Sequence, residues 1–158
     1  RSSNGLAMVL LREYWDCDLR VMESVGERFS AIQGRTCGVA IGDKAHAERG
    51  RFRYVYDLAE IWKRHTGLPF VFAVWAYRAD SIGRESLERI RAALEWGRLN
   101  RRQSAEKWAA NYGYGPEEAI HYLTQSISYA FDSTKHEAMK KYLHLLQDAR
   151  LAIKATGG

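Results

Sequence analysis

The feature that most constrains this chain is its longest apolar segment, which runs from Leu68 to Ala76. It has the length of a β-strand and falls far short of the roughly 20 apolar residues that a membrane span needs. Its central part, Phe70–Trp75, is apolar on both faces, which is typical of a strand covered by helices on both sides. The segment therefore excludes a transmembrane protein and predicts an α/β fold with a buried strand.

The first half of the chain alternates between extended and helical patterns around this strand. Short, apolar, β-branched or aromatic segments predict two further strands at Thr36–Ile41 and Tyr54–Tyr56. This alternation supports the α/β class. The helical spacing of apolar residues predicts helices at residues 4–15, at residues 19–33, from Asp43, and from a cap at Asp57 to a terminator at Gly67.

Beyond Tyr77 every pattern is helical. The wide apolar faces of these helices have no strands of this chain to cover, so we expect their partners in an upstream segment or in another chain. Self-association or exchange of domains between copies follows from the same observation. Two of the predicted helices cover Leu87–Leu94 and Trp108–Tyr112. A third begins at Pro116 and carries a buried stripe as far as Phe131. The last helix begins with a Thr134–Glu137 capping box and ends at Gly157.

The composition is that of a globular domain, with 46% hydrophobic and 27% charged residues. The net charge of +5 suits an anionic small molecule. Two arginine clusters, within residues 49–53 and 98–102, are compatible with phosphate contacts or with a solvated face. Cys17 and Cys37 are too few for a disulfide framework and are not spaced as zinc ligands, so they predict a reducing compartment and core packing.

Sequence motifs exclude several enzyme classes. The chain has no P-loop, no dinucleotide-binding glycine fingerprint, no HExxH and no G-x-S-x-G motif. Its histidines are scattered, and His136 and His144 stand too far apart on one predicted helix to share a metal ion. We therefore predict no metal and no cofactor, while His121 is open to a role as a base or as a structural residue.

Two candidate sites combine a helix start with polar side chains. Ser2-Ser3-Asn4 begins a predicted helix, whose free N–H groups and hydroxyls suit an anion, with plain capping as the alternative. Gly42 and Asp43 follow a predicted strand, which places the carboxyl group at the sheet edge where open α/β sheets bind ligands. Asp43 is then a base, a hydrogen-bond acceptor or an N-cap.

Three aromatic side chains near the ends of the predicted strands form a further candidate site. Tyr54, Tyr56 and Trp75 suit the wall of a pocket for a planar or cyclic ligand. Packing in the hydrophobic core is the alternative for all three.

Four stretches of the chain, in order, match the motifs of one protein family. Tyr122-Leu123-Thr124 also matches a late helix of that family. The four stretches are Arg1-Ser2-Ser3, the end of a Ser-Arg-Thr/Ser-Ser motif; Val39–Asp43, an "IGD" strand end; Tyr54–Leu58, a "YDL" helix entry; and Thr66–Trp75, the most specific. On these residues the chain resembles the menaquinone-biosynthesis family of the futalosine pathway, which contains chorismate dehydratase, from residue 1 to about residue 146. Sister enzymes of that family carry His at the position of Gly42, so Gly42 favours the dehydratase branch.

The resemblance implies a fold similar to the type-II periplasmic binding proteins, in which two α/β lobes flank a cleft. Residues 1–70 would form the second lobe, and residues 71–158 the returning strand and the C-terminal helical part of the first lobe. Family members begin well upstream of the Ser-Arg motif. The resemblance therefore also implies that the first segment of the first lobe is absent, which accounts for the helices without partners.

The resemblance further implies a hydro-lyase that eliminates water from chorismate to give 3-[(1-carboxyvinyl)oxy]benzoate. Ser3 and Asp43 would be catalytic, the serines would hold a carboxylate, and Gly42 would make room for the substrate. Asp43 would orient a group in the pocket whose wall the aromatic side chains line. The substrate-binding residues implied are Ser2, Ser3, Asn4, Gly42, Asp43, Tyr56 and Trp75.

A function of another class is the alternative. The same bilobed fold would also serve a non-catalytic small-anion binding protein, because a fold alone does not decide function. Nucleic-acid binding through the arginine clusters is a third possibility, which predicts salt-dependent retention on DNA. Our expectation is a cytoplasmic enzyme with chorismate as its partner, no nucleic acid, no membrane, no metal or cofactor, and self-association as a homodimer or by domain exchange.

Overall fold

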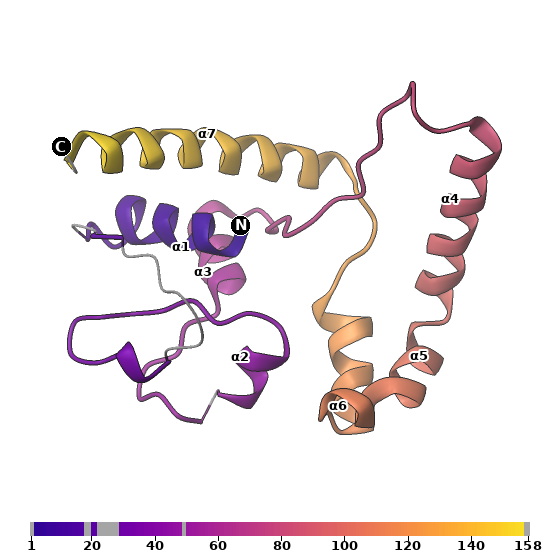
Figure 1. Cartoon of the computed structure of the whole chain (residues 1–158), viewed down its shortest axis with the longest axis horizontal. Helices are drawn as coiled ribbons and strands as arrows, with labels where there is room; N and C mark the ends of the chain where they lie inside the picture. The colour runs from indigo at the N-terminus through magenta and orange to yellow at the C-terminus, as the bar shows by residue number, and fades with distance from the viewer. Residues whose placement is uncertain (1, 18–19, 22–28, 49, 157–158) are drawn as a thin grey trace. The chain divides into compact units, whose positions relative to one another are not determined.

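Helices supply the regular structure of the described chain, which divides into two units (Figure 1). The computed structural model describes residues 2–17, 20–21, 29–48 and 50–156, with side chains as far as residue 151. The first unit joins Arg1–Ala73 to Asp132–Gly158, and the second is Val74–Phe131. The first unit contains α1 (Ser2–Glu13), the 3-10 turn η1 (Phe29–Ala31), α2 (Asp43–Ala47), α3 (Leu58–Thr66) and α7 (Ser133–Thr156). The second contains α4 (Arg84–Leu99), α5 (Arg101–Trp108), the 3-10 turn η2 (Ala109–Tyr112), α6 (Pro116–His121) and the π-helical turn η3 (Tyr122–Ser126).

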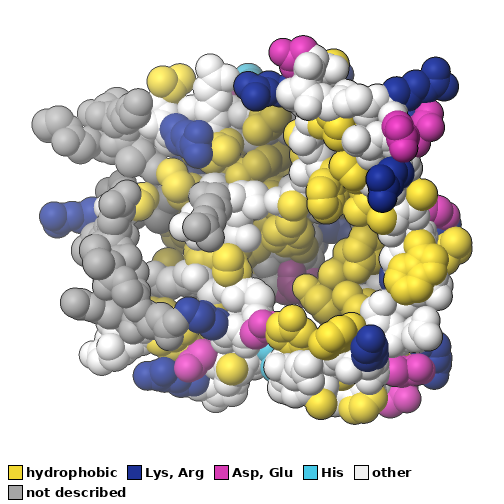
Figure 2. Space-filling model, turned by 45° about the vertical axis from the view of Figure 1, so that its right-hand side comes forward, with side chains coloured by type: hydrophobic (Ala, Val, Ile, Leu, Met, Phe, Trp, Pro, Cys, Tyr) yellow, Lys and Arg dark blue, Asp and Glu magenta, His cyan; other side chains and the backbone are white. Residues whose placement is uncertain are grey.

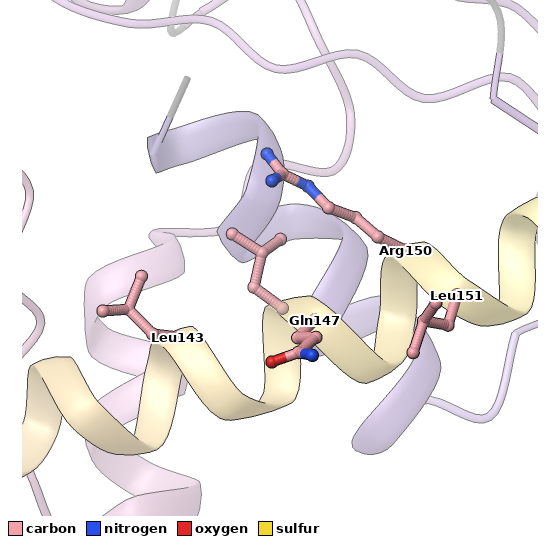
Figure 3. Close-up of a pocket in the computed structure, with 5 residues that line it drawn as sticks. Leu143, Gln147, Arg150 and Leu151 are labelled. Atoms are coloured by element: carbon pink, nitrogen blue, oxygen red, sulfur yellow. The ribbon is translucent and has the colours of Figure 1, made fainter.

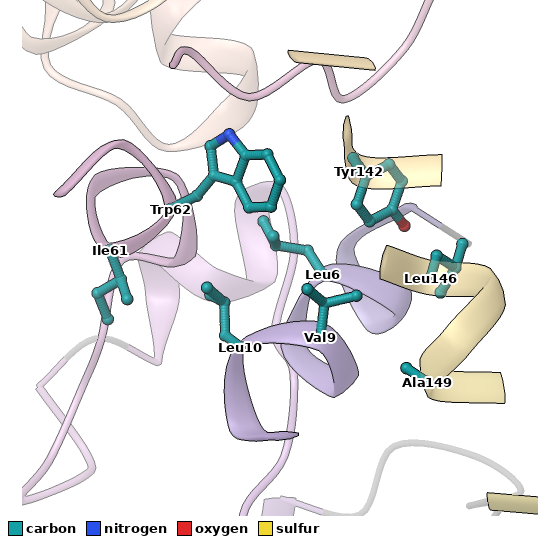
Figure 4. Close-up of a cluster of buried hydrophobic side chains, with 8 residues drawn as sticks. All are labelled: Leu6, Val9, Leu10, Ile61, Trp62, Tyr142, Leu146 and Ala149. Carbon is teal, nitrogen blue, oxygen red and sulfur yellow. The ribbon is translucent and has the colours of Figure 1, made fainter. Parts of the chain in front are cut away.

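The core of the first unit lies where α1, α3 and α7 meet (Figure 4). Helical spacing places Leu6, Val9 and Leu10 on one face of α1, and all three side chains are completely buried. Trp62 of α3 is also completely buried, and its ring meets the ring of Phe70 edge-on, with centroids 5.7 Å apart. The core consists of Leu6, Val9, Leu10, Ile61, Trp62, Tyr142, Leu146 and Ala149.

Local sequence determines both ends of α3. The carboxylate of Asp57 accepts hydrogen bonds from the backbone N–H groups of Ala59 and Glu60, at 2.8 and 3.0 Å, so the predicted N-cap is confirmed. Gly67 ends the helix in the left-handed conformation, with a φ of 72°, which glycine adopts without strain.

The start of α7 differs from its prediction. The carboxylate of Asp132 accepts a hydrogen bond from the backbone N–H of Lys135 at 3.0 Å, which makes Asp132 the cap just before the helix. The predicted capping box is wrong, because Thr134 lies inside the first turn. The hydrogen bond from Lys135 stabilises the ionised carboxylate and lowers the pKa of Asp132.

The second unit has a smaller core, made largely of alanine. α4 contains no buried residue, although Ile90 and Leu94 lie on its apolar face as predicted. Large apolar side chains of both units therefore reach the surface, where Figure 2 shows them in yellow. The buried residues of this unit are Ala105, Ala109, Ala119 and Ile120, with Tyr114 and Leu123 packed against them.

The predicted α/β bilobed fold, similar to the periplasmic binding proteins, is wrong for the part of the chain that the structure describes. That part contains no β-strand, and the segments predicted as strands, Thr36–Ile41, Tyr54–Tyr56 and Phe70–Trp75, have no regular structure. The physical reason is that a strand exists only through hydrogen bonds to a neighbouring strand. An apolar, β-branched segment expresses a preference for a sheet, but it does not supply the neighbour.

The helical predictions fared better. The helices predicted at residues 4–15, from Asp43 and from Asp57 to Gly67 are confirmed as α1, α2 and α3. The helix predicted at residues 19–33 lies largely outside the described residues, and its described end is the 3-10 turn η1. The predicted end of the last helix at Gly157 also lies outside them.

Other predictions of burial are wrong. The helix that begins at Pro116 ends at His121 and is followed by η3 as far as Ser126, so the predicted stripe holds at Ile120 and Leu123 but does not reach Phe131, which is exposed. Cys17 and Cys37 are exposed rather than packed in the core, and neither forms a disulfide. None of the described helices has the length and apolarity of a membrane span. The predicted division into lobes at residue 70 and the predicted self-association stay predictions.

Candidate functional site

The first turn of α1 carries the candidate anion site. Ser2 Oγ donates a hydrogen bond to the carbonyl oxygen of Phe72 at 2.8 Å. Ser3 is half-buried and Asn4 is exposed. Since the first N–H groups of an α-helix have no partners within the helix, this turn presents donors and the positive end of the helix dipole. The Ser2 hydroxyl already has an acceptor, so Ser3 and the backbone are the groups in this turn that suit an anion.

The same turn is also held by α7. The Tyr142 hydroxyl donates to the carbonyl oxygen of Ser2 at 2.9 Å. The two helices approach closely at Gly5, where an added Cβ would collide with the Tyr142 hydroxyl and lie 2.9 Å from Leu146 Cδ1. Gly5 is therefore required by the packing of α1 on α7.

Gly42 and Asp43 form the start of the short helix α2. Gly42 has a φ of 61° and a ψ of −146°, a conformation that favours glycine. No heavy atom of the described residues lies within 4 Å of a Cβ built there, so the backbone conformation, and not close contact, accounts for this glycine. Asp43 is the first residue of α2, and its side chain is exposed.

The aromatic candidates are exposed, which rules out the alternative of core packing. The ring of Tyr56 is 62% exposed and meets the ring of Trp15 at a centroid distance of 5.6 Å. Tyr54 carries the guanidinium of Arg53 over its ring, 5.2 Å from the centroid. Trp75 is 78% exposed and belongs to the second unit.

The structure does not bring Tyr56 to the end of α1 that carries the serines. Ser2 and Ser3 open the helix, whereas Tyr56 contacts Trp15, which follows its last turn. At a rise of about 1.5 Å per residue, the two ends of α1 are roughly 17 Å apart. Within the first unit, the serines and Tyr56 therefore mark two separate places.

The described residues offer no metal site, and a pocket among them lies away from the predicted residues. They contain no cluster of three or more His, Cys, Asp or Glu side chains that could hold a metal ion, and no buried charged side chain. A pocket of about 210 Å³ lies along α7, but none of the predicted site residues lines it (Figure 3). Its lining consists of Leu143, Leu146, Gln147, Arg150 and Leu151.

Comparison with known proteins decides the family. The sequence profile of a family described as menaquinone biosynthesis matches residues 1–148, which is nearly the whole chain. The chain belongs to the menaquinone biosynthesis family. The family resemblance read from the motifs at Ser2-Ser3, Gly42-Asp43 and Thr66–Trp75 is thereby confirmed.

One curated protein matches part of the chain. It is the chorismate dehydratase of Thermus thermophilus, which is 38% identical over 86 residues. The match covers 52% of this chain and 32% of the relative, so the chain matches about a third of that protein's length. No solved structure matches the chain.

Sequence analysis missed Tyr142 as a residue of the candidate site. It predicted this tyrosine only as part of the apolar stripe of the last helix. The side chain is 6% exposed, and burial raises the pKa of its hydroxyl, although nearby Arg150 opposes this. The hydroxyl therefore keeps its proton at neutral pH and donates to Ser2. A tyrosine in place of an aliphatic residue on a buried stripe was the available signal, since buried tyrosine hydroxyls usually have a partner.

Proposed function

We propose that this protein is a chorismate dehydratase, a hydro-lyase that converts chorismate to 3-[(1-carboxyvinyl)oxy]benzoate and water in menaquinone biosynthesis. The observation that carries the proposal is the family match over residues 1–148, together with 38% identity to a chorismate dehydratase over part of the chain. The proposal extends what is known of that relative to a chain that matches a third of its length.

The proposed reaction sets clear chemical demands. A proton leaves one ring carbon, the hydroxyl group leaves its neighbour as water, and the new double bond completes an aromatic ring. The step is redox-neutral, so the proposal includes no cofactor. Aromatisation favours the elimination, and the protein's task is to hold a dianion in place and to assist the movement of the proton and of the leaving group.

Ser3 is proposed to hold one substrate carboxylate at the first turn of α1. Its hydroxyl, the side chain of Asn4 and the first backbone N–H groups of the helix are donors that suit an anion. Ser2 contributes through its backbone, because its hydroxyl donates to Phe72. The helix N-terminus favours negative charge, which suits a carboxylate better than a neutral substrate.

The other predicted residues do not share the first turn of α1 with Ser3. Asp43 is proposed to orient a group of the substrate, with Gly42 shaping the backbone before it. Tyr56 contacts Trp15 beyond the last turn of α1, far from Ser3, so the wall-lining role predicted for Tyr56 and Trp75 stays a prediction and is not part of this site. A cytoplasmic location is proposed too, because the free, exposed thiols of Cys17 and Cys37 fit a reducing compartment. Nucleic acid and membranes are not among the proposed partners.

The decisive test is to incubate the full-length natural protein with chorismate and to analyse the products by mass spectrometry. A product lighter by one water supports the proposal. Chorismate returned unchanged, despite a thermal shift on its addition, would contradict the dehydratase and favour a small-anion binding protein. If neither the dehydrated product nor a thermal shift is observed, the assignment of chorismate as the ligand is refuted.

The anion site is tested by Ser3→Ala in the same protein. Loss of a hydrogen bond to a charged group costs about 1.5–3 kcal/mol, so the affinity for chorismate should fall roughly 10- to 150-fold. Ser81→Ala is the matched control, because it removes an exposed hydroxyl that bonds only its own turn, at Arg78. Equal affinity of the Ser3 and Ser81 variants would refute the site.

A further inference from the structure

The first turn of α1 is attached to two distant segments of the chain. Two hydrogen bonds reach Ser2 from segments far away in the sequence. Its hydroxyl donates to the carbonyl oxygen of Phe72 at 2.8 Å, and its own carbonyl oxygen accepts from the Tyr142 hydroxyl at 2.9 Å. Both the side chain and the peptide group of Ser2 are thereby held.

Tyr142, whose hydroxyl donates to Ser2, is held firmly by its neighbours. Tyr142 is 6% exposed, and its ring is enclosed edge-on by Phe70 and Trp62, at centroid distances of 4.9 and 6.2 Å. Gly5 allows the hydroxyl to approach the helix, because a Cβ there would occupy its place. A buried phenol packed against two aromatic rings has little freedom to follow a moving helix end, so it imposes a position on that end.

We propose that Tyr142 is a positioning residue that holds the first turn of α1, and so the donors of Ser3 and the following residues, in the arrangement that binds a substrate carboxylate. The proposal rests on the proposed function. Tyr142 acts through the carbonyl group of Ser2, whose peptide plane also carries the N–H of Ser3. Because this peptide group is planar, the hydrogen bond to its carbonyl oxygen also determines the direction of the Ser3 N–H.

This role differs from general stabilisation, and α1 offers an internal comparison. At its other end, Arg12 Nη1 donates to the carbonyl oxygen of Asp148 at 3.1 Å, which is also a bond between α1 and α7. That bond fastens the same two helices but lies beyond the first turn. Removal of either bond weakens the packing, whereas only the bond of Tyr142 governs the anion site.

The expected kinetic signature follows from where the contact acts. A carboxylate that takes no part in bond breaking is held equally in the ground state and in the transition state. Loss of such uniform binding raises KM and leaves kcat unchanged. Tyr142→Phe removes the hydroxyl and keeps the ring, so the aromatic packing survives.

The experiment compares chorismate turnover by the full-length natural protein with that of its Tyr142→Phe and Arg12→Met variants. Thermal unfolding of each confirms that it is folded. We expect Tyr142→Phe to raise KM at least fivefold with kcat within twofold of the unchanged protein, and Arg12→Met to leave KM within twofold. A KM within twofold for Tyr142→Phe, or an equal rise in both variants, overturns the positioning role. Absence of turnover by the unchanged protein overturns the proposed function and this inference together.

Discussion

The two units of this chain use apolar residues in opposite ways. In the first, large side chains from α1, α3 and α7 meet in one core, in which Trp62, Leu6 and Leu10 are completely buried. In the second, the buried residues are three alanines and Ile120. Trp96 is 63% exposed on α4, a helix without a buried residue. A similar apolar content thus gives a packed core in one unit and an open apolar surface in the other.

The difference teaches what a helix needs besides an apolar face. α1 and α4 both carry apolar residues at helical spacing, and both form. α1 packs against α3 and α7 and buries large side chains there, whereas α4 buries none. Burial against those two helices supplies the stabilisation that spacing alone does not. Exposed apolar faces of this kind are typical of surfaces that other parts of a protein, or other proteins, cover.

The largest expected effect distinguishes the two units by their tryptophans. Trp62→Ala removes a completely buried ring whose Nε1 donates to the carbonyl oxygen of Pro69 at 3.3 Å. It should lower the free energy of unfolding by about 3–5 kcal/mol in chemical denaturation. Trp96→Ala, on the exposed face of α4, should change it by no more than about 0.5 kcal/mol. Equal losses would mean that the second unit has a core of its own around Trp96.

The next effect uses one glycine from each unit. Gly5→Ala forces a methyl group against Tyr142 and Leu146, and this overpacking should cost about 1–3 kcal/mol of unfolding free energy. Gly97→Ala in α4 meets no heavy atom within 4 Å and should add about 0.5–1 kcal/mol, because alanine favours a helix over glycine. Thermal and chemical unfolding measure both. A stabilising Gly5→Ala would show that α1 and α7 are not in close contact there.

The smallest effect concerns acid. A hydrogen bond from the Lys135 backbone lowers the pKa of Asp132, and a hydrogen bond from Arg98 lowers the pKa of Glu95 in the second unit. Each folded-state pKa lies below the unfolded one, so each contribution to stability is present above the unfolded pKa, near pH 4, and is lost as pH falls through the folded value.

Asp132→Asn and Glu95→Gln should therefore each flatten the fall of the unfolding free energy below about pH 4. Added salt should weaken the contribution of Glu95 more, because its main partner is the charged side chain of Arg98. For Asp132 the backbone N–H of Lys135 contributes most, and the Lys135 ammonium, 3.4 Å away, contributes less. Denaturation curves of the variants at several pH values and salt concentrations would measure both effects. An unchanged acid limb in Asp132→Asn would refute the assigned capping role.

Sequence reasoning predicted the local parts of the fold well. Asp57 and Gly67 were identified as the start and end signals of α3, because their functions depend only on neighbouring backbone groups. It failed where a distant partner decides the outcome. The apolar segment Phe70–Trp75 predicted a strand, yet no described segment pairs with its backbone.

The candidate site shows the same division. Ser3 and Asp43 were found through predicted helix starts, and they lie in the first turns of α1 and α2 as the structure describes them. The separation of Tyr56 from the serines, and the role of Tyr142 beside Ser2, were not predictable. Both depend on how α1 packs, and no local pattern records that packing.

The sequence by itself determined the family, through the motifs that its profile matches, and most helix positions, through spacing, caps and terminating glycines. Only the tertiary structure decided which apolar faces are buried and which hydroxyl groups find partners. The physical reason is range. Capping and helix formation act within a few residues, whereas the hydrogen bond between Tyr142 and Ser2 joins residues 140 positions apart in the sequence. A core forms only where such distant segments meet.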